Sequence, residues 1–194
     1  MRTQRGPVAA RAALVEAATE LFAAKGNASL REVAQRAGVN HGLVHHYLGG
    51  KRGLRTAVLD HLASAFDTKL ELDANADMRT VAYAAIRAVD SDDRYVKILA
   101  RTLLDDALPD QLQTRFPFVS RLTATVDSAV TAQAKAVLAQ GLALSFGVAV
   151  FGPWICAALG LEPEQLRAIR DDALERAFAT IEAGETSETN EQRA

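Results

Sequence analysis

The stretch that decides the fold is SLREVAQRAGVNHGLVHHYLGGKRGL, residues 29–54. Ser29 and Glu32 have the spacing of a capping box, in which each side chain bonds to the backbone N–H of the other at a helix start. Gly38 permits the left-handed backbone that often ends a helix. Between them an apolar stripe runs at helical spacing, formed by Leu30, Val33, Ala34 and Ala37. The pattern predicts a two-turn helix that ends at a sharp turn.

A second short helix is predicted directly after this turn. Asn40 belongs to the residue types that cap helix starts, and Val44 and Leu48 lie one turn apart, so both can pack inward. Two glycines at 49 and 50 then break the chain before a long amphipathic helix that starts at Lys51 and reaches about residue 72. The other side chains of the short helix, which include three histidines and a tyrosine, are left free to face outward.

Helical periodicity also dominates the rest of the chain, and no run of alternating β-branched residues predicts a strand. A first helix is expected over residues 8–25. Later helices are expected over residues 78–89, 93–107, 116–130, 132–159 and 163–183. The sequence therefore predicts an all-α protein, followed by a polar and disordered tail.

Charge is distributed unevenly along the chain. Residues 1–60 carry nine lysines and arginines against four acidic residues, which gives +5, whereas residues 61–194 carry thirteen against twenty, which gives −7. Together they account for the net charge of −2 of the whole chain. A basic first part joined to an acidic body indicates that one end of the protein meets a polyanion.

One long segment, residues 136–161, carries no charge and is long enough to be weighed as a membrane span. Gln140, Ser145, four glycines and Pro153 interrupt it, and its flanks lack the aromatic and basic residues of a bilayer interface. We therefore expect a buried pair of core helices and no membrane partner. Cys156 is the only cysteine, so no disulfide forms within one chain, and no signal peptide is recognised, which favours a cytoplasmic protein.

The histidines also suggest metal or catalytic chemistry. His41 and His45 share a helical face, as zinc ligands do, but Gly42 stands where the zinc-protease pattern has a glutamate. We therefore expect no metal and no cofactor. Neither a nucleophile beside the histidines nor a phosphate loop or dinucleotide fingerprint occurs, so no enzyme is expected. Single residues of the body, such as Asp105 and Tyr95, leave acid–base chemistry open.

Nucleic acid is the third interpretation. Two short helices joined at AGVN, the second with polar and aromatic groups facing outward, have the dimensions of a helix-turn-helix. Residues 29–54 resemble the DNA-binding domain of the TetR family of transcriptional regulators, and the likeness covers residues 8 to about 60. It departs from the family pattern at His45, usually tyrosine, at Leu48, usually phenylalanine, and at Arg52, often an acidic residue.

The resemblance implies that the second short helix enters the major groove of DNA. Base edges would be contacted by Arg31, His41, Gly42, Leu43 and His46, with Arg31 the best candidate for a bidentate bond to guanine. Phosphates would be contacted by Ser29, Asn40, His45, Tyr47 and Lys51. A solvated helix charge is the alternative for Arg31, and a half-buried core position is the alternative for Tyr47.

The resemblance also implies a homodimer on a palindromic operator, because one short helix reads too few base pairs to define a genomic address. The uncharged segment and the helix over residues 163–183 suit the dimer interface. An effector pocket is implied in the body, with mostly apolar wall candidates Phe66, Tyr83, Tyr95, Leu99, Phe118, Leu122 and Trp154. An ordinary packed core is the alternative for each of them.

Three parts are thus expected: a helix-turn-helix DNA-binding domain at residues 8–52, a helical ligand-binding and dimerisation domain at 53–184, and a disordered tail at 185–194. The favoured function is a transcriptional regulator, above all a repressor, released from DNA by a hydrophobic or amphipathic small molecule. The alternative is a helical ligand-binding module or enzyme that does not bind an operator.

Overall fold

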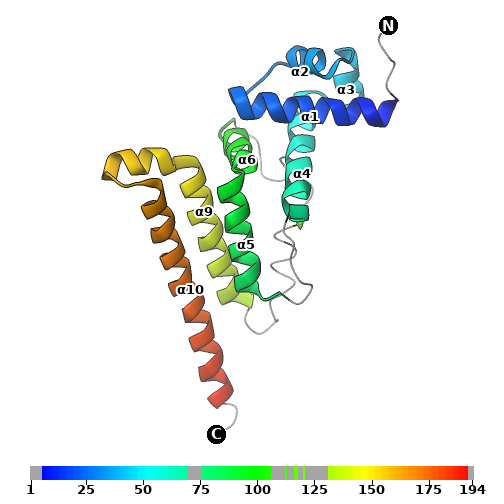
Figure 1. Ribbon diagram of the computed structural model, residues 1–194. Helices are drawn as coiled ribbons and strands as arrows, with labels where there is room; N and C mark the ends of the chain where they lie inside the picture. Colours follow the sequence, from blue (N-terminus) through cyan, green and yellow to red (C-terminus); the bar gives the residue numbers. More distant parts are fainter. Residues whose placement is uncertain are drawn as a thin grey trace. The chain divides into compact units, whose positions relative to one another are not determined.

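The computed structural model describes residues 6–69, 76–105, 112, 116, 117, 120 and 131–191 (Figure 1). All regular elements within these ranges are helices, which confirms the predicted all-α class. They are α1 (Pro7–Lys25), α2 (Leu30–Ala37), α3 (Gly42–Leu48), α4 (Lys51–Lys69), α5 (Met78–Ser91), α6 (Arg94–Leu104), α9 (Thr131–Leu159) and α10 (Pro163–Glu191). The helix predicted over residues 116–130 lies mostly outside the described residues.

The chain divides into two compact units, and the division differs from the predicted boundary at residue 52. The first unit joins residues 1–68 to residues 94–117, and the second joins residues 69–93 to residues 118–194. Both α4 and α6 therefore belong to the same unit as the helix-turn-helix. The reason lies in α4, because its buried residues Leu54, Val58 and Leu59 belong to the same core as α1, α2 and α3.

In the first unit, α2 and α3 lie on the same side of α1, and both contact it (Figure 1). Three side chains at the centre of this core, Leu14, Val33 and Val44, are fully buried. They come from α1, α2 and α3, so each short helix is held by the apolar face that its sequence pattern predicts. Because helices this short are marginal in isolation, this burial is what stabilises them.

Side chains of α6 and the residue after it contact α1 and α4. Arg101 donates a hydrogen bond of 3.3 Å to the carbonyl oxygen of Phe22, in the last turn of α1. Gly26, which ends α1 with a φ of 76°, leaves room for this guanidinium, since a Cβ there would stand 3.1 Å from its Cζ. Arg55 of α4 forms an ion pair with Asp105, the residue after α6. These contacts fix α6 within the first unit.

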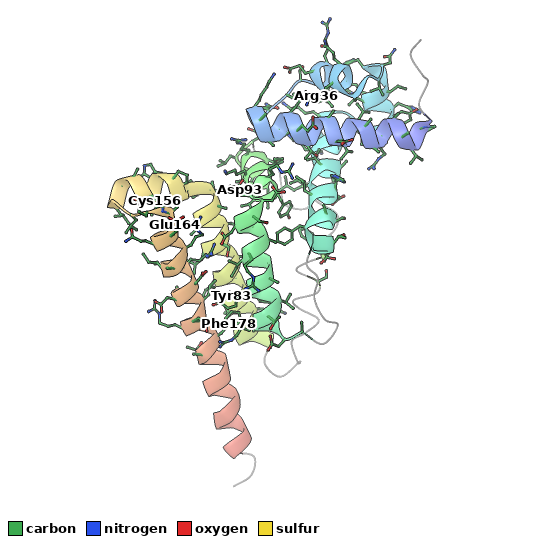
Figure 2. All side chains as sticks on the ribbon, in the orientation of Figure 1. Arg36, Tyr83, Asp93, Cys156, Glu164 and Phe178 are labelled. Atoms are coloured by element: carbon green, nitrogen blue, oxygen red, sulfur yellow. The ribbon has the colours of Figure 1, made fainter. Side chains whose placement is uncertain are left out.

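In the second unit, α9 packs against both α5 and α10. Polar contacts also join α5 directly to α10. Arg79 pairs with Glu175 at 2.7 Å, and the hydroxyl of Tyr83 donates to the carbonyl oxygen of Asp171 at 3.3 Å. Figure 2 shows Tyr83 beside Phe178, with ring centroids 6.2 Å apart.

The strongest of these contacts is formed by Arg170, whose side chain is only 2% exposed. Its two terminal nitrogens donate to the two carboxylate oxygens of Asp90 at 2.7 and 2.8 Å, and Nε donates to Asp171 at 2.9 Å. A planar guanidinium matches a carboxylate in this paired geometry. The buried charge is therefore compensated on two sides.

The helix α9 is less buried than the sequence suggests. Its segment Lys135–Leu159 is long and apolar enough to cross a membrane by length and composition alone, but so is the core helix of many soluble proteins. Only 17% of its most apolar window is buried. Val137, Leu138 and Ser145 are buried, whereas Phe151 and Trp154 are exposed. The sequence predicts a buried pair of helices here, whereas the structure has a single helix, α9, with one side buried and the other side exposed.

Two further differences concern the ends of α9 and α10. Figure 1 shows α9 changing direction over its yellow C-terminal part, which contains Pro153, as expected where a proline removes a helical hydrogen bond. The helix α10 continues to Glu191, into the segment for which the sequence predicts a disordered tail. Residues 192–194 lie outside the described residues.

Candidate nucleic-acid interface

The helix α2 begins with the predicted capping box. The Oγ atom of Ser29 accepts a hydrogen bond from the backbone N–H of Glu32 at 3.2 Å. In return, the Glu32 carboxylate accepts bonds of 2.8 Å from both the backbone N–H and the hydroxyl of Ser29. These hydrogen bonds, together with the Lys25 ammonium, lower the pKa of Glu32 to about 2. The hydroxyl proton of Ser29 is therefore already used within the protein.

The helix α3 starts at Gly42, with His41 as its N-cap residue, rather than with Asn40 in that place. The Oδ1 atom of Asn40 nevertheless accepts a hydrogen bond of 2.9 Å from the backbone N–H of Gly42. Asn40 thus holds the start of the helix through a side-chain turn. Its amide nitrogen makes no hydrogen bond within the described part of the chain and remains a free donor.

The outer surface of α2 and α3 carries most of the predicted DNA contacts. Leu43 and Tyr47 are partly buried, and Tyr47 packs against the core of the first unit, as its alternative interpretation states. The Tyr47 ring meets that of His46 edge-on, with 5.0 Å between centroids. The exposed members of the predicted set are Ser29, Arg31, Asn40, His41, Gly42, His45, His46 and Lys51.

Cations in the first unit fall into two groups. Lys25 and Arg36 pair with Glu32 and Glu20, at 3.3 and 2.5 Å, and these pairs join α1 to α2. Figure 2 shows Arg36 on α2. Arg31, Lys51 and Arg52 are exposed and have no carboxylate partner among the described residues. Unpaired cations on a surface raise its positive potential and favour an anionic partner.

The start of α4 extends this surface. The carbonyl oxygen of Gly50 accepts the backbone N–H of Leu54 at 3.0 Å, which places Lys51 and Arg52 in the first helical turn. Arg52 is a departure from the family pattern and is not among the DNA contacts predicted from the sequence. The signal that identifies it is a second cation directly beside Lys51.

The rings of His41 and His45 have their centroids 6.0 Å apart. Across the residues that the structure describes, no group of three or more His, Cys, Asp or Glu side chains is arranged to hold a metal ion. Both side chains are exposed, and an imidazole ring can donate a hydrogen bond, as the nucleic-acid interpretation requires.

The predicted pocket residues that the structure describes are divided between the two units. Phe66 and Tyr95 lie together in the first unit, with ring centroids 6.4 Å apart, and Leu99 packs against the same core as Tyr95. Tyr83 belongs to the second unit and packs on Phe178. Trp154 is 72% exposed, so it does not line an enclosed space in this chain. Phe118 and Leu122 lie outside the described residues.

Fold and surface together define a class of protein: an all-α protein with a helix-turn-helix whose second helix presents polar donors beside unpaired cations. The family model for bacterial regulatory proteins of the tetR family matches residues 14–58. An HTH-type transcriptional repressor of Mycobacterium tuberculosis is 40% identical over 183 residues, which cover 91% of this chain and 92% of the relative. An HTH-type transcriptional regulator of Mycobacterium bovis gives the same values. The chain therefore belongs to the TetR family of DNA-binding transcriptional regulators, as the resemblance predicts.

Solved structures confirm the fold. A transcriptional regulator from Rhodococcus sp. Rha1 has a TM-score of 0.62 at 22% identity, and the match covers 90% of this chain and 96% of that one. A protein from a Rhodococcus sp. that is described as a TetR-family transcriptional regulator has a TM-score of 0.57 at 21% identity, over 87% of this chain and 98% of that one. The family consists of regulators rather than enzymes.

Proposed function

We propose that the chain is a cytoplasmic, ligand-responsive repressor that binds a palindromic operator as a homodimer and releases it when a small hydrophobic molecule binds. The observation that supports a DNA-binding surface is that some cations of the first unit are paired with carboxylates and others are not. Lys25 and Arg36 are neutralised by carboxylates, whereas Arg31 and Lys51 are exposed and pair with no carboxylate among the described residues. The word repressor follows the name of the M. tuberculosis relative.

For base reading, α3 lies in the major groove with His41, Gly42, Leu43 and His46 toward the base edges. Gly42 supports this placement, because a Cβ added there would meet only Oδ1 of Asn40, at 3.5 Å. The fold itself therefore leaves room for a larger side chain at this position. A close approach of the helix to DNA gives a reason for glycine that packing does not. Arg31 of α2 reaches guanine from the same side.

For phosphate binding, we assign the largest roles to Lys51 and to the amide of Asn40. His45 is exposed and adds a donor, whereas Tyr47 is held partly in the core and offers only its hydroxyl end. Ser29 contributes chiefly by holding the start of α2. A bond from its hydroxyl to a phosphate would require that hydroxyl to leave the Glu32 carboxylate.

For dimerisation, we propose that a second copy of the chain covers the open side of α9. The exposed apolar residues of α9 and α10 are Leu144, Phe151, Trp154, Leu159 and Ile169. Water-exposed apolar groups of this size on neighbouring helices are typical of a protein interface. A two-fold pair of chains carries two copies of α3, which suits a palindromic operator.

For the effector, Phe66, Tyr95 and Leu99 are the best-supported contacts among the predicted set, because the structure brings these three together. Their aromatic and aliphatic character favours an apolar or amphipathic molecule. Trp154 is reassigned to the dimer interface on account of its exposure.

The test of DNA binding compares unpaired with paired cations. Fluorescence anisotropy would measure binding to the promoter region next to the gene, for the wild type and four variants. Arg31→Ala is expected to weaken specific binding by about 1–3 kcal/mol and to relax one base position, and Lys51→Ala to lower the salt slope by about 1. Arg36→Ala and Lys25→Ala are the matched controls, since their side chains are paired within the protein.

Two results would count against the proposal. One is a wild type that binds the promoter no better than the Arg31→Ala, Lys51→Ala double variant at low salt. The other is an equal loss of affinity in the two control variants, which would show that the sorting of cations has no bearing on DNA.

A further inference from the structure

The junction between α3 and α4 is formed by backbone atoms in direct contact. Gly49 and Gly50 join the helices with φ values of 66° and 89°, a conformation that other residues rarely adopt. Inside α4, a Cβ added at Gly53 would stand 1.7 Å from the carbonyl oxygen of Leu48 and 2.8 Å from its carbonyl carbon. The first turn of α4 therefore rests on the last carbonyl group of α3, with no side chain between them.

Neither helix can easily withdraw from this contact. The side chains of Leu48 and Leu54, on the two sides of the junction, are 6% and 0% exposed and belong to one core. A Cβ at Gly50 would stand 3.2 Å from Cε1 and Nδ1 of His45, so the junction is close-packed there as well. A clash with a carbonyl group cannot be relieved by a side-chain rotation. Any side chain at residue 53 must therefore move α3 relative to α4.

We propose that Gly53 is a positioning residue for DNA reading: it lets the backbone of α4 lie against the carbonyl of Leu48 and thereby fixes the recognition helix α3. This inference rests on the proposed DNA-binding function. Base contacts made by Leu43 and His46 depend on the orientation of α3, and productive geometry is held to within about 0.5 Å in such sites. Phosphate contacts tolerate larger shifts, because a flexible cation can follow the backbone.

The substitution that tests this is Gly53→Ala, with Gly152→Ala as the matched control. Gly152 lies inside α9, where a Cβ would meet Cδ2 of Leu166 at an ordinary 3.5 Å. The wild type first selects an operator from a random duplex library, and anisotropy then gives the affinities for that duplex and for a shuffled one. For Gly53→Ala we expect at least a tenfold loss, about 1.4 kcal/mol, for the selected duplex and a change within about twofold for the shuffled one.

A second measurement does not depend on DNA. Amide hydrogen exchange should accelerate in residues 42–54 of Gly53→Ala and stay unchanged in α1 and throughout Gly152→Ala. Unchanged exchange over residues 42–54, or an equal loss of affinity for both duplexes, would overturn the positioning role. Failure of the wild type to select any duplex would instead contradict the proposed function, while the exchange measurement would still decide whether Gly53 fixes α3.

Discussion

Glu32 shows how a single exposed residue ties the stability of the helix-turn-helix to pH. Its carboxylate accepts two hydrogen bonds from Ser29 and pairs with Lys25, and its pKa falls from 4.5 to about 2. A carboxyl whose pKa is lowered by folding stabilises the folded state above its unfolded pKa. That contribution is lost as the pH falls toward the folded pKa. The relevant window therefore lies between about pH 4.5 and pH 2.

We predict that Glu32→Gln makes thermal unfolding less sensitive to acid. Glutamine still accepts the capping hydrogen bond but does not titrate. The thermal unfolding midpoint is followed by circular dichroism from about pH 5 to about pH 2.5, which spans most of the window in which Glu32 titrates. As the pH falls, the midpoint of the variant should decrease less steeply than that of the wild type. Glu16→Gln is the control, because this exposed carboxylate of α1 forms no ion pair with any described residue. A parallel decline in the wild type and Glu32→Gln would contradict the role of the charge.

The side chain of Asn40 has two groups with separable roles, one in the stability of the helix start and one in the proposed DNA binding. Its oxygen holds the N–H of Gly42, and its amide nitrogen is free. We predict that Asn40→Ala lowers the free energy of unfolding by about 1 kcal/mol, as the loss of a helix-start acceptor does. Asn40→Asp keeps the acceptor and should keep most of the stability, yet lose DNA affinity, because a donor becomes a negative charge beside phosphate. Urea unfolding and anisotropy measure the two effects, and equal DNA affinity of Asn40→Asp and wild type would exclude the phosphate contact.

At the scale of helices, α5 and α10 are joined by the buried guanidinium of Arg170. Removal of one partner of a buried ion pair leaves the other charge uncompensated, which is strongly destabilising. We predict that Arg170→Met lowers the free energy of unfolding by about 3 kcal/mol, the lower end of the usual range, since Asp90 keeps some contact with water. Arg176→Met is the matched control: its pair with Asp172 is 71% and 62% exposed, and the expected change is below about 0.5 kcal/mol.

Denaturant unfolding monitored by circular dichroism suits this comparison, because the described elements are all helices. Similar midpoints for Arg170→Met and Arg176→Met would show that the buried pair contributes no more than a surface pair.

Helices were predictable from sequence where their signals are local. The capping box at Ser29 and Glu32 and the apolar spacing of Val44 and Leu48 involve neighbours in the chain, and the structure confirms both. By contrast, a largely apolar helix such as α9 has the same sequence pattern whether its apolar side faces the core or a second chain. Glycine is needed at residue 53 because the carbonyl group of Leu48, on the other side of the α3–α4 junction, occupies the place of a Cβ. Sequence spacing does not reveal that contact.

The exposure of the proposed DNA contacts was predictable for the same reason, whereas the grouping of the pocket candidates was not. Arg31, His41 and His46 lie within one short motif whose outward face follows from helical geometry. The candidate pocket residues are distant in sequence, and only the fold decides which of them meet. Phe66 and Tyr95 do meet, whereas Trp154 lies on the surface.

At the scale of the whole molecule, the proposed dimer rests on the open side of α9. We predict that the wild type sediments at twice the 20.8 kDa chain mass and that a Phe151→Arg, Trp154→Arg variant sediments as a single chain. Charges placed in an apolar interface lose hydration without gaining partners, so association is lost. Val8→Arg, at an 84% exposed position of α1, is the control and should leave the mass unchanged. If the Phe151→Arg, Trp154→Arg variant still sediments as a dimer, the interface does not involve this side of α9.

The apolar side of α9 also has a genetic consequence. In the proposed dimer, pairing through α9 requires nothing of α3, so a chain that cannot read DNA would still pair with a working one. Cells that express the Arg31→Ala, Lys51→Ala double variant next to the wild-type allele would hold mixed pairs with a single competent reading helix, and the damaged allele would be dominant. Adding Phe151→Arg and Trp154→Arg to the damaged copy would make it recessive again.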